Sequence, residues 1–511
     1  MAIVLLVQSL RHKIALGLYA ALLVVPALAE SRTTPSPPNA PVKSAPVKPG
    51  QISASRPLTL LGAVHTALAQ NLRLRAGGQL VAAGRAEVDI ARSGLLPQVE
   101  FGLSASSIDA DRASAGFGRL PQHRSLATLE VEQNIYSDTH FARHAVAKML
   151  QEAREIEQEE RGLDTVLGTA IAYLDLLRAE NLARIQEENL RLSESNYERA
   201  QSRLELGVAN RAEVYRFETQ RAAANVFLSE ARALVTQQRI TLNQTMNQPL
   251  GDQYRALGPN LQSLVSQQII RDTLANPARR GLLGAFFVVE STDRSPELRR
   301  LRKQIDAEAR VLTAVQRSLY LPTLTADATL DQELGRGGAG QDQFDFGTGI
   351  DGPQFGGRTN KTEWEVRLEA NLALYQGGSR YSQRTKQQRE IDALRLHYDE
   401  ALVRIQASAM RQFEAAAARY DQIAYASIAA NASANNFRLV RESHERGIVP
   451  IIDLIDAQVT GIRAEQAAAN ALYNFLVEYM RLQRISGQFD LVANDEERSQ
   501  YRARLEKFIG P

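Results

Sequence analysis

The chain has 511 residues, of which 44% are hydrophobic and 23% are charged, and its formal charge at pH 7 is +2. Its mean hydropathy of -0.28 excludes a bundle of membrane-spanning helices, although its length could fill roughly two or three ordinary domains. It contains no cysteine, which excludes disulfides, thiolate metal sites, a cysteine nucleophile and a lipid-modified N-terminal cysteine.

The N-terminus predicts a signal peptide over residues 1–29. A basic segment, Arg11-His12-Lys13, precedes the apolar run 14–25, and residues 26–29 offer an A-x-A cleavage site. The alternative, an anchoring membrane helix, needs about twenty apolar residues, and this run is shorter. Because removal of the signal takes away Arg11 and Lys13 but no acid, the formal charge falls from +2 to 0. No basic footprint for nucleic acid remains.

Residues 58–250 predict a first set of elements behind a tether. The stretch 30–57 is rich in Pro, Ser, Ala and Lys and has few large apolar residues, which is typical of a disordered tether. Two short helices are expected next, and alternating apolar and polar residues then predict a β-hairpin over 98–136. The helices span 58–71 and 74–95, the strands span 98–105 and 129–135, and a polar loop, 106–124, joins the strands.

Proline-free stretches rich in Ala, Leu, Glu and Arg predict a coiled-coil hairpin over 138–247. Its two helices are expected at 138–206 and 212–246, with a turn at Gly207 between them. Residues 251–292 interrupt this helical pattern. They predict an irregular insertion that contains a strand-like apolar run at 282–289.

The same order of elements recurs over residues 293–490, which predicts an internal duplication. Gly447, at the end of the last long helix, follows Gly207 by 240 residues. That helix, 379–445, has no proline and extends roughly 100 Å at about 1.5 Å per residue. The remaining predictions are a helix over 296–320, a β-hairpin over 322–375 with strands at 324–330 and 364–374 around a Gly-rich loop at 335–357, a coiled-coil hairpin over 379–486, and a tail over 491–511.

The alternation is strictest in the strand predicted at 364–374, where Trp364, Val366 and Leu368 lie on one face and charged residues on the other. About eleven residues suffice for a tilted strand to cross a bilayer, with its apolar face toward lipid and its charged face toward a wet lumen. One chain supplies four such strands, but a single-chain barrel needs at least about eight, so the chain must oligomerise.

We predict a trimer, because three copies supply about twelve strands, whereas a barrel of about eight strands is filled by its own side chains. The predicted fold class is therefore mainly α, with long helical hairpins forming an α-barrel and four strands per chain contributing to a 12-stranded membrane β-barrel. Aromatic residues are expected to form the girdle of this barrel: Phe101, Tyr136, Trp364 and Tyr375.

The sequence resembles the TolC-like outer-membrane efflux protein family, the outer membrane factors, over roughly residues 58–491. The resemblance is carried by LTLLGAVHTALAQN at 58–71, LLPQV at 95–99, AYLDLL at 172–177, LGVA at 206–209, LYQGG at 374–378 and IDLIDA at 452–457. It implies a trimeric channel in the outer membrane of a Gram-negative bacterium, with a helical tunnel in the periplasm and neither catalytic residues nor cofactors. Its closed tip opens when a periplasmic adaptor (membrane fusion protein) and an inner-membrane RND or ABC transporter engage it. The resemblance leaves multidrug efflux and type I secretion open, and it does not identify the cargo.

The resemblance also implies roles for residues at the tip. The family's narrowest ring corresponds to Asp453 and Asp456, which lie three residues apart on one helix face. Three copies would place up to about six carboxylates around one axis, which attracts cations. The alternative is a pair of ordinary solvated acids at a helix start. The adaptor-facing turns correspond to Gly207, Val208, Gly447 and Ile448.

A gate contact of the family corresponds to Glu213 and His444. The family pairs an acid with a tyrosine there, so His444 is a departure, and a contact with Glu213 would strengthen as His444 gains a proton. The alternative is two solvated, unpaired side chains. A second contact of the family is missing, because its arginine is Val449 here and its acceptor position is Ala212.

Two other classes of protein are alternatives to the channel. An enzyme is not supported, because His140 and His144 are the single helical histidine pair and lack a metalloprotease glutamate, which favours a solvated face over a metal site. The run 335–340 lacks a phosphate-binding lysine. A soluble periplasmic coiled-coil adaptor or scaffold protein is the alternative function, although an adaptor does not require four strands of bilayer-crossing length.

Overall fold

The computed structural model describes residues 56–115, 120–207, 210–258, 268–340, 361–490 and 492–510. These residues belong to one compact unit, Ile52–Pro511. The predicted signal peptide, 1–29, and the predicted tether as far as residue 55 lie outside the described residues.

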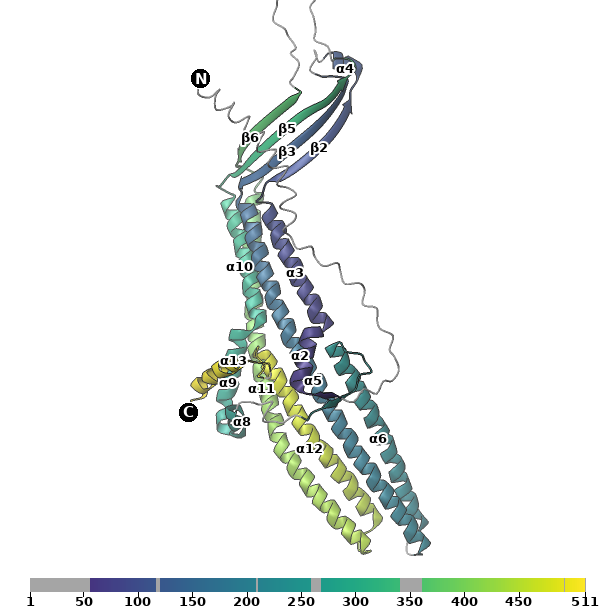
Figure 1. Cartoon of the computed structure of the whole chain (residues 1–511). Helices are drawn as coiled ribbons and strands as arrows, with labels where there is room; N and C mark the ends of the chain where they lie inside the picture. Colours follow the sequence, from purple (N-terminus) through teal and green to yellow (C-terminus); the bar gives the residue numbers. More distant parts are fainter. Residues whose placement is uncertain are drawn as a thin grey trace, which may run out of the picture. The chain divides into compact units, whose positions relative to one another are not determined.

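Helices, a four-stranded sheet and a two-stranded sheet make up the described part of the chain (Figure 1). The helices are α2 (Leu60–Gln70), α3 (Leu72–Ser93), α4 (Ala110–Ser114), α5 (Asp138–Glu205), α6 (Arg211–Met246), α8 (Gln268–Ala275), α9 (Pro277–Arg294), α10 (Pro296–Arg317), α11 (Ser379–Glu445), α12 (Ile451–Ile485) and α13 (Asp495–Ile509). The strands are β1 (Arg56–Leu58), β2 (Gln98–Ser107), β3 (His123–Tyr136), β4 (Tyr254–Ala256), β5 (Thr323–Gly337) and β6 (Thr362–Asn371). None of the helices among these residues combines the length and the apolar character that a membrane crossing requires.

The larger sheet is antiparallel and has the strand order β2-β3-β5-β6 (Figure 1). β3 begins at His123, before the predicted start at Leu129, because His123 pairs with Ser107 of β2 and with Gly337 of β5. β5 likewise continues past Leu330 into the predicted loop at 335–357, whose residues 341–360 lie outside the described residues. These extensions were missed because their Ser, Arg and Gly residues break the apolar alternation.

The register separates the sheet into an apolar and an acidic face. Trp364 pairs with Leu330, Leu330 with Leu129, and Leu129 with Phe101, so all four side chains belong to one row of the apolar face. The acidic face, in the rows through residues 325, 327, 329 and 331 of β5, carries eight acids and one cation. The acids are Glu100, Glu130, Glu132, Asp327, Asp331, Glu363, Glu365 and Glu369, and the cation is Arg367.

The first strand corrects the predicted tether. Arg56 and Pro57 fall within the predicted disordered stretch 30–57, but they belong to β1, which pairs in parallel with β4. The buried Tyr173 of α5 joins this sheet, because its hydroxyl donates to the Leu58 carbonyl at 2.6 Å and accepts from the Leu257 N–H at 3.0 Å. Burial raises the pKa of Tyr173 to about 12.

The long helix α5 lies against five others, one of which is α2. Its first half packs on α3 and α10 and its second half on α6 and α12. At the N-terminus of α5, Asp138 accepts hydrogen bonds from Arg310 at 3.1 Å and from Arg317 at 3.0 Å, both of α10. Burial raises the pKa of Asp138, but the hydrogen bonds from the two arginines outweigh burial and hold the pKa below its ordinary value. This carboxylate therefore anchors α10 beside the end of β3.

The predicted insertion, 251–292, is mainly helical rather than irregular, and its strand-like run at 282–289 is part of α9. The buried residues Leu283, Phe286, Phe287 and Glu290 recur at the spacing of one helix face. Phe287 packs on Phe413 of α11, with ring centroids 6.2 Å apart. Burial of one face against α11 thus favours a helix over a strand, although the run contains β-branched residues, which favour strands.

The predicted tail, 491–511, contains α13, which packs on α9. Asn494 caps the helix through a reciprocal capping box with Glu497. Tyr501 is buried, and its ring lies 5.5 Å from that of Phe286 of α9. Arg504 also reaches the buried Glu290 of α9 at 2.8 Å. The C-terminal helix and the insertion therefore share one core with α5, α11 and α12.

A bidentate ion pair fastens α9 to α11 and makes stability depend on pH. Arg280 donates to both carboxylate oxygens of Asp421 at 2.7 and 2.6 Å, and this hydrogen bonding lowers the pKa of Asp421 from its ordinary value of 3.8. A carboxyl group whose pKa is lower in the folded than in the unfolded protein stabilises the fold at pH values above its unfolded-state pKa. This stability is lost as the pH falls through the folded-state pKa.

We therefore expect the Asp421→Asn variant to be less stable than the natural protein at pH 6, by about 1 kcal/mol or less because the pair is partly exposed. As the pH falls from 3.8 through the lower folded-state pKa of Asp421, the difference should shrink toward zero, because Asp421 of the natural protein then becomes neutral like Asn. Thermal unfolding of the purified protein at pH 6, 4 and 3 checks this. A constant difference across the three values would contradict it.

Candidate gate at the helix tips

Two glycine turns end the long helices. Gly207 follows α5 with a φ of +74°, and Gly447 follows α11 with a φ of +77°, a left-handed conformation that other residues rarely adopt. The Gly447 N–H donates to the His444 carbonyl at 2.8 Å, and the Ile448 N–H donates to the Ser443 carbonyl at 2.9 Å. Ile448 is 68% exposed, which leaves its side chain available for contact. The predicted turn residue Val208 lies outside the described residues.

A small apolar cluster joins the α5–α6 hairpin to the α11–α12 hairpin near these turns. Its buried members are Ala200 of α5, Val214 and Phe217 of α6, and Leu454 of α12. Partly buried side chains pack around it: Tyr197, Leu204, Phe437, Val440, Ile451 and Ile455. The two hairpins of one chain are therefore in direct contact at their tips, and we call this set the tip cluster.

Asp453 and Asp456 lie in the first turns of α12, and both side chains are exposed. Leu454 and Ala457, by contrast, are buried at 3% and 4% exposure. This alternation follows the helical period, so the two carboxylates share an exposed face beside the packed one. The geometry agrees with the predicted pair on one face, while their place in a pore stays a prediction.

Glu213 and His444, the predicted gate contact, approach each other in the structure. Nε2 of His444 lies 3.9 Å from Oε1 of Glu213, and the two side chains are only 12% and 15% exposed. Glu213 also pairs with Arg203 at 3.4 Å, and Nδ1 of His444 contacts the Val449 carbonyl at 3.0 Å. The two side chains are therefore neither solvated nor unpaired, and they connect α6 of one hairpin with α11 of the other.

Sequence reasoning missed Arg203. Its contact with Glu213 could be predicted from the helical spacing only if α6 were already known to fold back beside the end of α5. Arg203 of α5 supplies a cation beside Glu213 of α6, within one hairpin. Gate function for this cluster stays a prediction.

The predicted girdle residues do not occupy one level of the sheet. Phe101 and Trp364 share a row within the strands, at 65% and 55% exposure. Tyr136 is the last residue of β3, and Tyr375 follows the end of β6 by four residues. Contact of these aromatic side chains with lipid remains a prediction.

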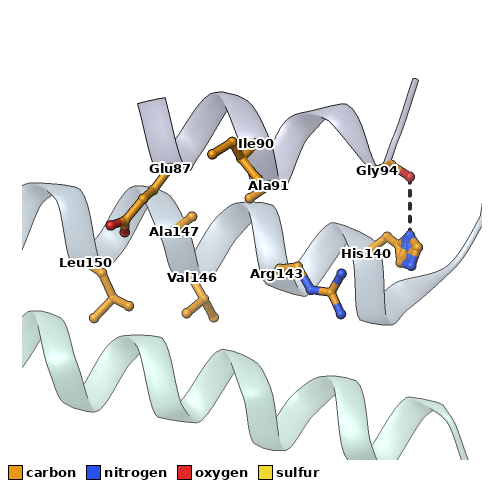
Figure 2. Close-up of a pocket in the computed structure, with 9 residues that line it drawn as sticks. All are labelled: Glu87, Ile90, Ala91, Gly94, His140, Arg143, Val146, Ala147 and Leu150. Atoms are coloured by element: carbon orange, nitrogen blue, oxygen red, sulfur yellow. Dashed lines mark hydrogen bonds between the residues drawn. The ribbon is translucent and has the colours of Figure 1, made fainter. Parts of the chain in front are cut away.

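An open hollow between α3 and α5 has a volume of about 340 Å³ and is lined in part by His140, the first residue of the helical histidine pair (Figure 2). The walls are mainly apolar, with Ile90 and Leu150 among them, and Nδ1 of His140 contacts the Gly94 carbonyl at 3.2 Å. Burial and the nearby charge of Arg143 lower the pKa of His140. Within the described ranges, no group of three or more histidines and acids could hold a metal ion.

Helical hairpins of this length and a sheet with one apolar and one acidic face are the features expected of a channel of the outer membrane with a helical portion in the periplasm. The family model described as outer membrane efflux protein matches residues 63–248 and 288–488. The chain belongs to this family, whose members are transport channels rather than enzymes.

Individual relatives are distant in sequence but similar over most of their length. The outer membrane efflux protein BepC of Brucella suis is 23% identical over 488 residues, which are 90% of this chain and 93% of that protein. Among solved structures, the channel CusC has a TM-score of 0.67 at 15% identity and covers 84% of this chain and 92% of its own. The CmeC outer membrane channel of Campylobacter jejuni has a TM-score of 0.66 at 14% identity, covering 88% of this chain and 89% of its own.

Proposed function

We propose that three copies of this chain close a 12-stranded barrel and a helical tunnel that exports cargo delivered by an inner-membrane RND or ABC transporter through a periplasmic adaptor. One observation carries the proposal: β2 and β6 each pair on one side only among the described strands, so a single sheet has two open edges. Open edges in lipid leave backbone groups unsatisfied, and closure with further copies removes them.

The helices support the same closure. In the order α3, α5, α10, α11, each helix packs on the next, which leaves α3 and α11 at the two margins. Leu396, Val403 and Met410 of α11 recur every seven residues and are 69%, 65% and 60% exposed. Side chains seven residues apart lie on one helix face, so these three form an exposed apolar stripe that a helix of a neighbouring copy can cover.

The tip has the features of a gated, partner-facing end in this proposal. The turns at Gly207 and Gly447 with Ile448 are proposed to dock the adaptor, and Asp453 and Asp456 from three copies to form the narrowest ring. Glu213 and His444 are proposed to hold the closed state. Membership of the family sets aside the soluble adaptor considered above, and both efflux and type I secretion remain compatible with this duct.

The proposal is tested by extracting the protein from outer membranes and measuring its assembly and its current. A trimer whose gel migration changes on heating, and which carries ions in a planar bilayer, is the expected result. Recovery of a monomer in the soluble periplasmic fraction, without any current in bilayers, would contradict the proposal.

The acidic face of the sheet leads to a prediction of ion selectivity. This face carries eight acids and a single cation. If it lines the lumen, the channel should pass K⁺ in preference to Cl⁻. Replacing Glu100, Glu130 and Glu365, which share one row, by Gln should lower the K⁺/Cl⁻ permeability ratio by about threefold or more, because charges in a pore act within roughly a 10 Å screening length. Reversal potentials in a salt gradient measure the ratio.

The control is a matched triple variant with Gln at three exposed acids of the helices: Glu205, Glu218 and Glu230. It removes the same charge from the chain and should leave the ratio near that of the natural protein. Equal ratios for both triple variants would remove the acidic face from the conducting path.

A further inference from the structure

Five polar side chains form a buried layer between the two hairpins, adjacent to the tip cluster and on the side away from the turns. We call it the polar layer: Gln186, Asn189, Ser193 and Asn196 of α5 and Gln458 of α12. Their exposures are only 8%, 7%, 0%, 5% and 2%. Buried polar groups are tolerated where their hydrogen bonds are satisfied, so the contacts of this layer decide what it can do.

One residue of α12 contacts three residues of α5. Nε2 of Gln458 donates to Oδ1 of Asn189 at 3.1 Å and to Oγ of Ser193 at 3.3 Å. Its Oε1 accepts from Nδ2 of Asn196 at 3.2 Å. Both amide hydrogens and the carbonyl oxygen of Gln458 are thus in use. A further bond, from Asn189 to Gln186 at 3.2 Å, extends the layer along α5.

This arrangement fits a single register of α12 on α5. A slide of one helical turn, about 5.4 Å, replaces Gln458 by a residue three or four positions away. Those positions hold Leu454, Ile455, Gly461 and Ile462, and none of their side chains can hydrogen-bond. The amides of α5 would then be buried without partners, so the layer disfavours every neighbouring register.

The layer separates a strong part of the hairpin contact from a weak one. Among the described residues, the main core, on the side away from the tip, has 30 buried apolar residues, of which 17 belong to α5, α6, α11 and α12, whereas the tip cluster has four. Apolar burial is the main source of cohesion between helices, so the tips can part while the core holds. The polar layer lies at the boundary between these two parts of the contact.

We propose that Gln458 is a positioning residue that fixes α12 on α5 and so holds Asp453 and Asp456 in the resting position of the gate. The inference rests on the proposed channel function. Asp456 precedes Gln458 by two residues and Asp453 by five, within one continuous helix. Displacement of α12 along α5 therefore moves the carboxylates with it, and opening the tip requires the three bonds of Gln458 to break.

The test compares three variants of the whole protein. Gln458→Leu removes the bonds and leaves three polar partners on α5. A fourfold variant, with Asn189→Leu, Ser193→Ala and Asn196→Leu added to Gln458→Leu, replaces Gln458 and its three partners by apolar residues and leaves only Gln186, at the edge of the layer. The control is Thr460→Val, which changes an exposed polar residue of α12 outside the layer. Thermal unfolding, the resting current in a bilayer and the distances between spin labels at position 452, which is exposed and lies on the tip side of the layer, are measured for each.

The fourfold variant should unfold at or above the temperature of the natural protein, because apolar replacement of a buried polar set is often neutral or stabilising. Its resting current should nevertheless rise by roughly tenfold, and its label distances should broaden, since no group then specifies the register. Gln458→Leu should also leak, whereas the control should not.

A fourfold variant with the resting current and the narrow distances of the natural protein would overturn the proposal. A leak seen in Gln458→Leu but absent from the fourfold variant, whose stability is restored, would also overturn the proposal. It would mean that the layer acts through stability alone. A natural protein that carries no current at all would contradict the channel function instead, and the label distances would still decide whether the layer sets the register.

Discussion

Covalent linkage of Glu213→Cys to His444→Cys is expected to abolish export. The two side chains lie 3.9 Å apart and belong to α6 and α11, which are helices of different hairpins. A single contact between two side chains can be separated by an adaptor, whereas a covalent bridge cannot. Since the chain has no other cysteine, every bridge forms at the chosen positions.

A short bifunctional maleimide suits this pair better than oxidation to a disulfide. A disulfide requires Cα atoms within roughly 7 Å, and the Cα atoms of two long side chains that meet at their ends lie far apart. Export of a pump substrate from whole cells is measured before and after linkage. The matched control joins Arg203→Cys to Glu213→Cys, a pair that is equally close, at 3.4 Å, but lies within a single hairpin. Its linkage should leave export intact. Free export from cells with a fully linked Glu213–His444 pair would remove this contact from the gate.

The long helices could be predicted from the sequence because local signals mark both their course and their ends. The structure has α11 at Ser379–Glu445, the residues predicted for it, and a glycine with positive φ follows. A stretch without proline and rich in good helix formers specifies the helix, and the glycine specifies its end. No distant part of the chain is needed for this prediction.

Elements whose state depends on distant partners were predicted less well. The run at 282–289 contains Phe286, Phe287 and two valines, which favour a strand locally, and only packing on Phe413 of α11 makes one helix face of it. α13 likewise depends on a surface provided by Phe286. Both contacts join residues more than 100 positions apart, so no local pattern contains them.

The residues of the candidate gate are equally hard to predict from local sequence patterns. The pairing of Glu213 with His444 was expected only from resemblance to a family, since the two residues belong to different halves of the chain. The polar layer left a signal that can be recognised afterwards: Asn189, Ser193 and Asn196 have the spacing of core positions on α5. Polar residues at such positions weaken the apolar pattern of a helix, which hides its packed face from a search for hydrophobic periodicity.

Replacing Asp453 and Asp456 by Ala is expected to relieve block of the channel by multivalent cations added on the periplasmic side. Both side chains are exposed on one face of α12, and three copies would bring about six carboxylates to one constriction. A unit charge pair about 4 Å apart gains about 1 kcal/mol even in bulk water, so a trivalent cation among several carboxylates gains more than the roughly 2.7 kcal/mol that corresponds to a hundredfold change in affinity. The half-blocking concentration of hexaamminecobalt(III) should therefore rise by about a hundredfold or more.

Single-channel current at increasing hexaamminecobalt(III) concentration measures this block, and each single variant should give an intermediate value. Glu465→Ala is the control, because Glu465 is an exposed acid of the same helix, nine residues beyond Asp456 and so about 13 Å farther along its axis. A ring at the narrowest point acts on every ion that passes, whereas an acid away from it is screened by salt. The two aspartates should thus dominate block while Glu465 contributes little, and similar half-blocking concentrations for the double variant and the natural protein would place the constriction elsewhere.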